Sequence, residues 1–201
     1  VTRNEIKQKI GGLSDIMLVN AINGSKNLLQ WDYNSFNAQG NLKINDEDSN
    51  VISEILEEIF CQFKGYCSDR LIFEKINNQY PEFLSRNGIE NATNLFYVLQ
   101  NILGEKYQFS RPHICQKDTV DSLTTKNIAL YLLGTTRQIS RREFMQIAKD
   151  VYWSETTADL IFYELEKDYI RISDDIYILY NNFSVQENVL NQVATWLKNH
   201  I

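Results

Sequence analysis

Two stretches of the chain repeat one pattern: Ala92-Thr-Asn-Leu95-Phe96-Tyr97-Val-Leu99 and Ala158-Asp-Leu-Ile161-Phe162-Tyr163-Glu-Leu165. In both, Ala, Leu or Ile, Phe and Leu stand at positions i, i+3, i+4 and i+7, which lie on one face of an α-helix. Each stretch therefore predicts a helix that buries this face in a core. Two Leu- and Phe-rich helices can match by coincidence, but the predicted neighbouring elements also agree, and this favours an internal repeat.

Around the first stretch the sequence predicts three helices and a hairpin. In order, these are a helix from Val51 to Lys64-Gly65, a helix capped by Ser68 that ends before Pro81, a helix from about Asn91 to Leu103, and paired strands at 107–110 and 113–115. Gly104 is the predicted stop of the third helix.

The same order returns after residue 122. The predicted elements are a helix over 123–133, a helix opened by the capping box Ser140-Arg-Arg-Glu143, a helix over 155–167 capped by Ser154, a hairpin of 169–172 with 176–180, and a last helix opened by a capping box of Ser184 and Glu187. The Asp174-Asp175 turn of the hairpin suits positive φ angles.

The first 50 residues form a separate segment. A capping box of Thr2 and Glu5 opens a helix, and two short strands follow at 28–33 and 42–44. The polar run Asn45–Asn50 is the clearest candidate linker. The predicted domains are therefore 1–49, 50–121 and 122–201, the last including the C-terminal helix.

Three helices followed by a two-stranded hairpin resemble the winged-helix branch of the helix-turn-helix family. The resemblance covers residues 50–116 and 122–180 and rests on pattern, without a diagnostic motif. It implies a mostly α fold with short β-hairpins, built from tandem units of three helices and a two-stranded wing, with a degenerate unit within 1–49. The third helix of such proteins commonly enters the DNA major groove, while many members use these surfaces for protein assembly. The long connection Gln79–Glu90 departs from the family pattern.

Composition restricts the class of protein. The 201 residues, 43% of them hydrophobic, are enough to bury a sizeable core. No apolar run is long enough to cross a membrane, and the first residues lack the pattern of a signal peptide. Three cysteines are a sparse, odd set, so we expect free thiols and a cytoplasmic protein. Cys61, Cys67, His113 and Cys115 lack the spacing of a zinc knuckle, so no metal is expected and these residues are interpreted as buried small residues and a strand histidine.

Net charge argues against general nucleic-acid binding. The chain carries −6, and the stretches 1–66, 67–122 and 123–201 each hold more acidic than basic residues. One local basic cluster stands out, formed by Arg137, Arg141, Arg142 and Lys149. This cluster either grips phosphates or is an ordinary solvated surface.

The predicted outer faces of the two repeated helices carry the candidate partner-binding residues. In the second helix these are Leu160, Tyr163 and Lys167, and in the first they are Asn94, Tyr97 and Asn101. Asn side chains can pair with adenine edges or be solvated surface. The two tyrosines are candidates for a partner or self-association surface, or they cover their own hairpin or a neighbouring helix.

No recognised catalytic or cofactor-binding motif is present. The phosphate loop, the dinucleotide loop, the zinc-protease motif and the nucleophile elbow are all missing, and the only histidines are His113 and His200. We therefore expect no enzyme activity and no cofactor. Two hypotheses remain: a non-catalytic module of tandem winged-helix units that binds another protein or itself in DNA-associated or regulatory machinery, or a transcription regulator that binds duplex DNA directly, though weakly.

Overall fold

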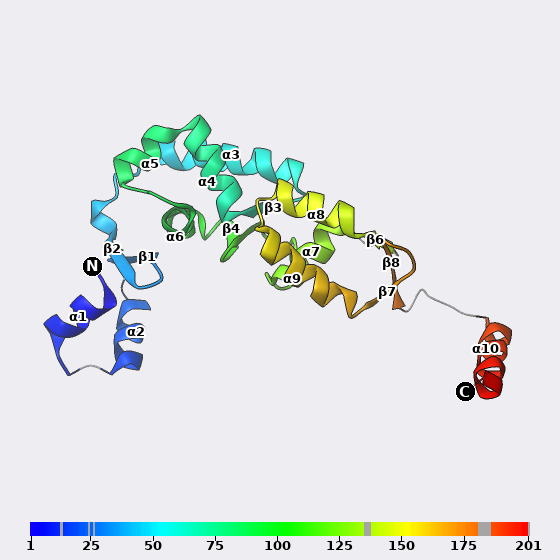
Figure 1. Cartoon of the computed structure of the whole chain (residues 1–201). Helices are drawn as coiled ribbons and strands as arrows, with labels where there is room; N and C mark the ends of the chain where they lie inside the picture. Colours follow the sequence, from blue (N-terminus) through cyan, green and yellow to red (C-terminus); the bar gives the residue numbers. More distant parts are fainter. Residues whose placement is uncertain (13, 24, 26, 135–137, 181–185, 201) are drawn as a thin grey trace. The chain divides into compact units, whose positions relative to one another are not determined.

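The computed structural model describes residues 1–12, 14–23, 25, 27–134, 138–180 and 186–200. Helices dominate this part of the chain and small antiparallel sheets accompany them, which confirms a mostly helical fold with short hairpins (Figure 1). The chain packs as two units. Unit 1 comprises Val1–Ile128 with Val151–Trp153, and unit 2 comprises Ala129–Asp150 with Ser154–Ile201.

The N-terminal segment begins with the predicted capping box. The Thr2 hydroxyl accepts from the Glu5 amide at 3.3 Å, and the Glu5 carboxylate accepts from the Thr2 amide at 2.7 Å. The elements are α1 (Arg3–Ile10), α2 (Asp15–Asn23), β1 (Leu28–Asp32), β2 (Ser35–Ala38) and the 3-10 helix η1 (Gln39–Asn41).

The partner of β1 differs from the sequence prediction. β1 pairs with β2 across a tight turn, in which the Asp32 carboxylate accepts from the Tyr33 amide at 2.7 Å. The prediction of a strand at 42–44 is wrong, because Leu42 and Ile44 instead pack against the core of unit 1.

The first repeat follows directly. Its elements are α3 (Asp46–Gln62), β3 (Tyr66–Ser68), α4 (Asp69–Gln79), α5 (Pro81–Asn87), α6 (Ala92–Leu103), β4 (Tyr107–Ser110) and β5 (His113–Gln116). The polar run that begins at Asn45 is not a linker. The Asn45 side chain caps α3 by accepting from the Asp48 amide at 2.8 Å, and the Asp48 carboxylate returns a bond from the Asn45 amide at 2.9 Å.

The sheet of the first repeat has three strands rather than the predicted two. The strand order is β3-β5-β4, all antiparallel, with Tyr66 opposite Cys115. β3 is only three residues long and buried throughout, so it shows no alternation of apolar and polar residues.

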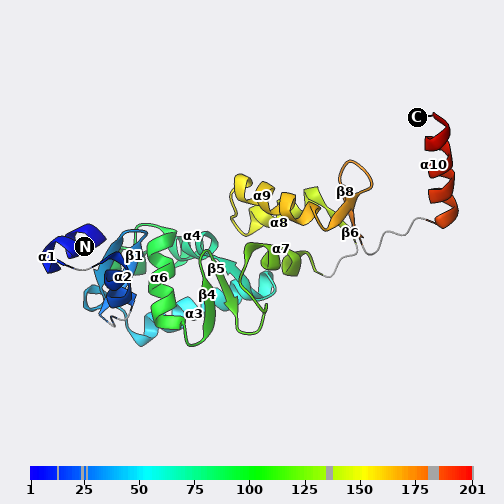
Figure 2. The same ribbon diagram turned by 90° about the horizontal axis from the view of Figure 1, so that it is seen from below.

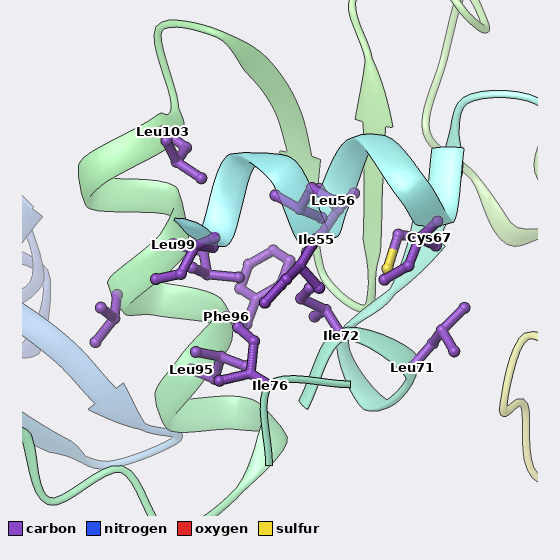
Figure 3. Close-up of a cluster of buried hydrophobic side chains, with 14 of the residues drawn as sticks. Ile55, Leu56, Cys67, Leu71, Ile72, Ile76, Leu95, Phe96, Leu99 and Leu103 are labelled. Atoms are coloured by element: carbon purple, nitrogen blue, oxygen red, sulfur yellow. The ribbon is translucent and has the colours of Figure 1, made fainter. Parts of the chain in front are cut away.

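The repeated apolar face of α6 lies in the core of unit 1. Phe96 and Leu99 are buried, and α6 packs against α3 and α4. Figure 3 shows the side chains that converge between these three helices, which include Ile55, Leu56, Ile72, Ile76, Leu95, Phe96 and Leu99. The predicted core positions Leu95, Phe96 and Leu99 are confirmed, whereas Ala92 is only half-buried.

The second repeat has the same order of elements except that it has no counterpart of α5. They are α7 (Thr125–Leu133), β6 (Gln138–Ser140), α8 (Arg141–Asp150), α9 (Glu155–Glu166), β7 (Tyr169–Arg171) and β8 (Ile176–Leu179). Its strand order, β6-β8-β7, matches that of the first sheet position for position. The sequence pattern does not predict β6 either, because this strand has only three residues.

The turn between β7 and β8 does not use positive φ angles. Among the described residues, those other than glycine with positive φ are Lys64, Asp118 and Tyr152, so the prediction for Asp174-Asp175 is wrong. The Asp175 carboxylate accepts instead from the Ser140 hydroxyl at 2.6 Å and from the Arg142 amide at 2.9 Å. This capping of the start of α8 holds the turn.

The last element is α10 (Glu187–His200). The predicted capping residue Ser184 lies outside the described residues. Within the described part of the chain, no helix has the length and apolar content that a bilayer crossing requires.

Candidate interaction surface

α9 has one buried and one exposed face. The Ser154 hydroxyl caps the helix by accepting from the Thr157 amide at 3.1 Å. Ala158, Ile161, Phe162 and Leu165 are buried, as the repeat predicts. The ring of Phe162 meets Tyr177 of β8 edge-on at 5.0 Å, so the hairpin fixes the rotation of α9.

The opposite face of α9 carries exposed apolar side chains. Leu160 is 63% exposed and Tyr163 is 64% exposed. The Lys167 ammonium lies 5.4 Å from the centre of the Tyr163 ring, which is cation–π geometry. We call Leu160, Tyr163 and Lys167 the α9 face. The predicted exposure of all three residues is confirmed.

The predicted basic cluster is partly neutralised. Arg137 lies outside the described residues. The Arg141 guanidinium donates to the Asp159 carboxylate at 2.7 Å, and this hydrogen bond raises the pKa of Arg141. Arg142 and Lys149 are exposed, but the Asp175 carboxylate binds the Arg142 amide. Acidic groups therefore lie directly beside the basic ones.

Asn94 does not lie on an exposed face, contrary to the prediction. It is only 2% exposed, and its side-chain amide donates to the Trp31 carbonyl at 2.6 Å. Its side-chain oxygen accepts from the Glu90 amide at 3.2 Å. Because both polar atoms are used inside unit 1, Asn94 joins α6 to β1 and is not available to a partner.

The N-terminal hairpin covers the rest of this side of α6. α6 packs against β1 (Figure 2), and the exposed Asn101 accepts from the Gln39 side chain at 3.0 Å. Tyr97 is half-buried, packs against the core, and meets the Phe96 ring edge-on at 5.6 Å. The prediction of an open outer face is therefore wrong for α6, because a distant segment of the chain packs on it.

The tip of the first hairpin is tied to its own repeat. The Arg111 guanidinium lies 3.4 Å from the Asp69 carboxylate and donates to the Thr93 hydroxyl at 2.6 Å. At the base of the hairpin, Lys106 lies 3.5 Å from the Glu57 carboxylate. Both cations are thus paired with carboxylates.

His113 is the centre of a buried polar chain that the sequence did not reveal. The Tyr66 hydroxyl accepts from the Trp153 indole at 2.8 Å and lies 3.1 Å from His113 Nδ1. His113 Nε2 lies 3.1 Å from the Thr125 hydroxyl. Burial lowers the pKa of His113 to about 4. This histidine is neutral and enclosed, so it is placed as a structural group rather than a general base.

The cysteines are free thiols in the structure. Cys67 and Cys115 are buried in β3 and β5, as interpreted from the sequence, but Cys61 is exposed on α3, where that interpretation is wrong. Burial raises the pKa of Cys67 and of Cys115. Over the described ranges, no three His, Cys, Asp or Glu side chains are grouped so as to hold a metal ion.

Acid should destabilise unit 1 through His113. Its pKa is lowered in the folded state, so the unfolded chain binds the proton more readily and stability falls as pH drops from 6.5 towards 4. We expect a loss of about 2 kcal/mol between roughly pH 7.5 and pH 5. Denaturant unfolding at both pH values measures it. His113→Gln, which keeps a donor and an acceptor, should remove most of this loss; an equal loss in the variant would contradict the assignment.

No protein-family model, curated protein or solved structure matches the chain.

Proposed function

We propose that the chain is a non-catalytic assembly module of two winged-helix units, and that the α9 face binds a protein partner. The α9 face consists of Leu160, Tyr163 and Lys167, all on one exposed side of the third helix of the second repeat. The partner would belong to DNA-associated or regulatory machinery, in keeping with the winged-helix resemblance.

The order of elements supports the winged-helix part of the proposal. In each repeat a helix, a short strand, a second helix and a third helix precede a hairpin. In each sheet the short strand pairs with the last strand of the hairpin, which gives the orders β3-β5-β4 and β6-β8-β7. Two segments that share both the order of elements and the order of strands fit one ancestral unit that was duplicated. α5 is an addition within the long connection of the first repeat.

The observation that carries the functional part is the exposure of Leu160 and Tyr163. Exposed large apolar side chains three residues apart form a continuous apolar surface on the helix. Tyrosine gives a large contact area with few rotatable bonds, and a tyrosine that a lysine already stacks on is partly ordered before binding. Both properties favour a protein interface.

Three observations disfavour direct DNA binding. The outer side of α6 is covered by β1, Arg111 is paired with Asp69, and Arg141 is paired with Asp159. Groove insertion of α9 would also bring Asp159 and Glu164 near phosphates. A protein partner with both polar and apolar groups on its surface fits this mixture of acidic and basic residues better than the negatively charged backbone of a nucleic acid.

Tyr163→Ala should weaken partner binding by about 1 to 3 kcal/mol and leave thermal stability nearly unchanged, because the ring is exposed. A photo-crosslinking residue at position 160 of the full chain, used in extract of the native cells, identifies the protein that touches the α9 face. The affinity of that purified protein is then measured for the wild type and for Tyr163→Ala by calorimetry.

Tyr33→Ala is the matched control, since Tyr33 is also exposed but belongs to the β1–β2 turn of unit 1. It should bind as the wild type does. Equal affinities for Tyr163→Ala and the wild type would contradict the proposal. Nanomolar binding to random duplex DNA at about 0.15 M salt would replace it with the regulator hypothesis.

A further inference from the structure

The two three-stranded sheets correspond residue by residue. Each has a row of three opposed residues, one from each strand: Tyr66, Cys115 and Gln108 in the first sheet, and Gln138, Ile178 and Ile170 in the second. Opposed residues of an antiparallel pair point to the same face of the sheet, and so do alternate residues along a strand. Ile114 and Tyr177 point to the other face, which packs against the core with α6 or α9. The row of three therefore marks the outer face of each sheet.

In the first repeat, the outer face is covered by segments that follow it in the chain. His113 and Cys115 of β5 lie on this face and are at most 2% exposed. His113 Nε2 lies 3.1 Å from the Thr125 hydroxyl at the start of α7, and Ile128 of α7, which belongs to the same unit, is fully buried. The Trp153 ring meets the His113 ring edge-on at 6.3 Å. The first turn of α7 and Trp153 thus shield this face from water.

In the second repeat, the outer face is apolar and partly exposed. Five large side chains form it: Ile170, Ile172, Ile176, Ile178 and Tyr180. Ile172 is 46% exposed, Tyr180 is 68% exposed, and the other three are half-buried. An antiparallel sheet face that meets water normally carries polar residues. Four isoleucines at these positions indicate that another element packs here, and we call the five residues the isoleucine face.

The helix that follows the isoleucine face in sequence is α10. In the first repeat, residues 117–124 separate β5 from α7, and in the second, residues 180–186 separate β8 from α10. α10 therefore has the place in the second repeat that α7 has in the first. Seven residues span at most about 24 Å, which is enough to bring α10 back over a sheet of three strands that is about 10 Å wide.

α10 has the apolar surface that this contact requires. Five exposed apolar residues lie within about 60° of one direction around the helix: Val189, Leu190, Val193, Trp196 and Leu197. Glu187 and Lys198 lie about 120° and 140° from the centre of this stripe, so both stay in water when the stripe is covered. A helix of 14 residues is only marginally stable in water by itself, so packing on a surface would stabilise α10.

We propose that α10 packs its apolar stripe on the isoleucine face of the same chain, as the first turn of α7 packs on the outer face of the first sheet. The contact removes two apolar surfaces from water at once, and it closes the second repeat in the way that the first is closed. The proposal goes beyond the proposed function and does not rest on the α9 face, because α9 packs on the inner face of the same sheet.

The first test is amide hydrogen exchange of α10 in the full chain. The amides of residues 193–197 should exchange about tenfold or more slowly than those of an unstructured peptide. Val193→Asp puts a carboxylate into the contact and should remove most of this protection. Asn191→Asp is the matched control, because it adds the same charge to the same helix about 160° away from Val193. Its protection should stay within about threefold of the wild type.

The second test changes the isoleucine face and measures α10. Ile172→Asp replaces an exposed side chain of the hairpin and should lower the protection of α10 about fivefold or more, although residue 172 lies outside this helix. Ser173→Asp, at the next exposed position and off the isoleucine face, should leave α10 as in the wild type. Unchanged protection of the β8 amides in both variants shows that the sheet itself is intact.

Several results overturn the proposal. They are α10 amides that exchange in the wild type as in an unstructured peptide, equal effects of Val193→Asp and Asn191→Asp, and an Ile172→Asp variant with wild-type protection of α10. Protection of α10 that rises with protein concentration between about 5 and 200 µM would assign the contact to a second copy instead of the same chain. Each of these results leaves the partner binding of the α9 face to be decided by Tyr163→Ala alone.

Discussion

Trp153→Ala is expected to lower the free energy of unfolding of unit 1 by about 3 to 5 kcal/mol, the usual range for removing a large buried aromatic side chain. Trp153 is buried, meets the Tyr66 ring edge-on at 6.1 Å, and donates its indole proton to the Tyr66 hydroxyl. The substitution leaves a cavity and removes the hydrogen bond that the indole gives to the Tyr66 hydroxyl.

Hydrogen exchange of the β3 and β5 amides measures this loss without assuming that the two units unfold together. Protection of these amides should fall strongly in Trp153→Ala. Tyr152→Ala is the control, because the neighbouring Tyr152 is 46% exposed. Exchange in Tyr152→Ala should stay within about threefold of the wild type. If both variants lowered protection equally, the indole would have no special role.

Asp48→Ala is expected to destabilise unit 1 by about 2 to 3 kcal/mol, because it removes the buried acceptor of several hydrogen bonds, while the exposed Arg86 is free to rehydrate. The Asp48 carboxylate is buried and accepts from the Tyr80 hydroxyl at 2.6 Å, from the Asn45 amide at 2.9 Å and from the Arg86 guanidinium. Burial acts to raise the pKa of Asp48, but the bonds from Tyr80, Asn45 and Arg86 outweigh it, and its pKa is lowered.

The sign of the pH effect follows from this lowered pKa. Asp48 stabilises the fold above the ordinary aspartate pKa of 3.8, and this contribution is lost as pH falls below 3.8 through the lowered value. Urea unfolding near neutral pH measures the loss in Asp48→Ala. Glu47→Ala, at an exposed position in the same first turn of α3, should change stability by less than about 0.5 kcal/mol. A comparable loss in Glu47→Ala would point to the helix dipole rather than to the buried bonds of Asp48.

Local chemistry made much of the fold predictable. Ser68, Asn91 and Ser154 cap their helices through bonds to residues three positions away, so the signal lies within one helical turn of sequence. The core faces of α6 and α9 follow from apolar residues at helical spacing around Phe96 and around Phe162. This signal also lies within a few turns of sequence.

Contacts between segments that are distant in sequence could not be predicted from these local patterns. Helical geometry put Asn94 and Tyr163 on equivalent outer faces, but β1 covers Asn94 while Tyr163 is exposed. Nothing within α6 signals this difference, because the covering strand is remote in sequence. β3 and β6 were missed for a related reason, since a three-residue strand is defined by its partner and not by its own pattern.

Because Val151–Trp153 belongs to unit 1, the order of synthesis affects the folding of this unit on the ribosome. Unit 1 is discontinuous in sequence: Tyr66 and Ser68 leave the ribosome long before Trp153 and Val151, which complete their hydrogen bonds. At ordinary rates of translation, the interval between residues 128 and 153 lasts about 1 to 5 s. During that time β3 lacks its hydrogen bonds to Val151 and Trp153, so the packing of unit 1 is completed only after α8 has been synthesised.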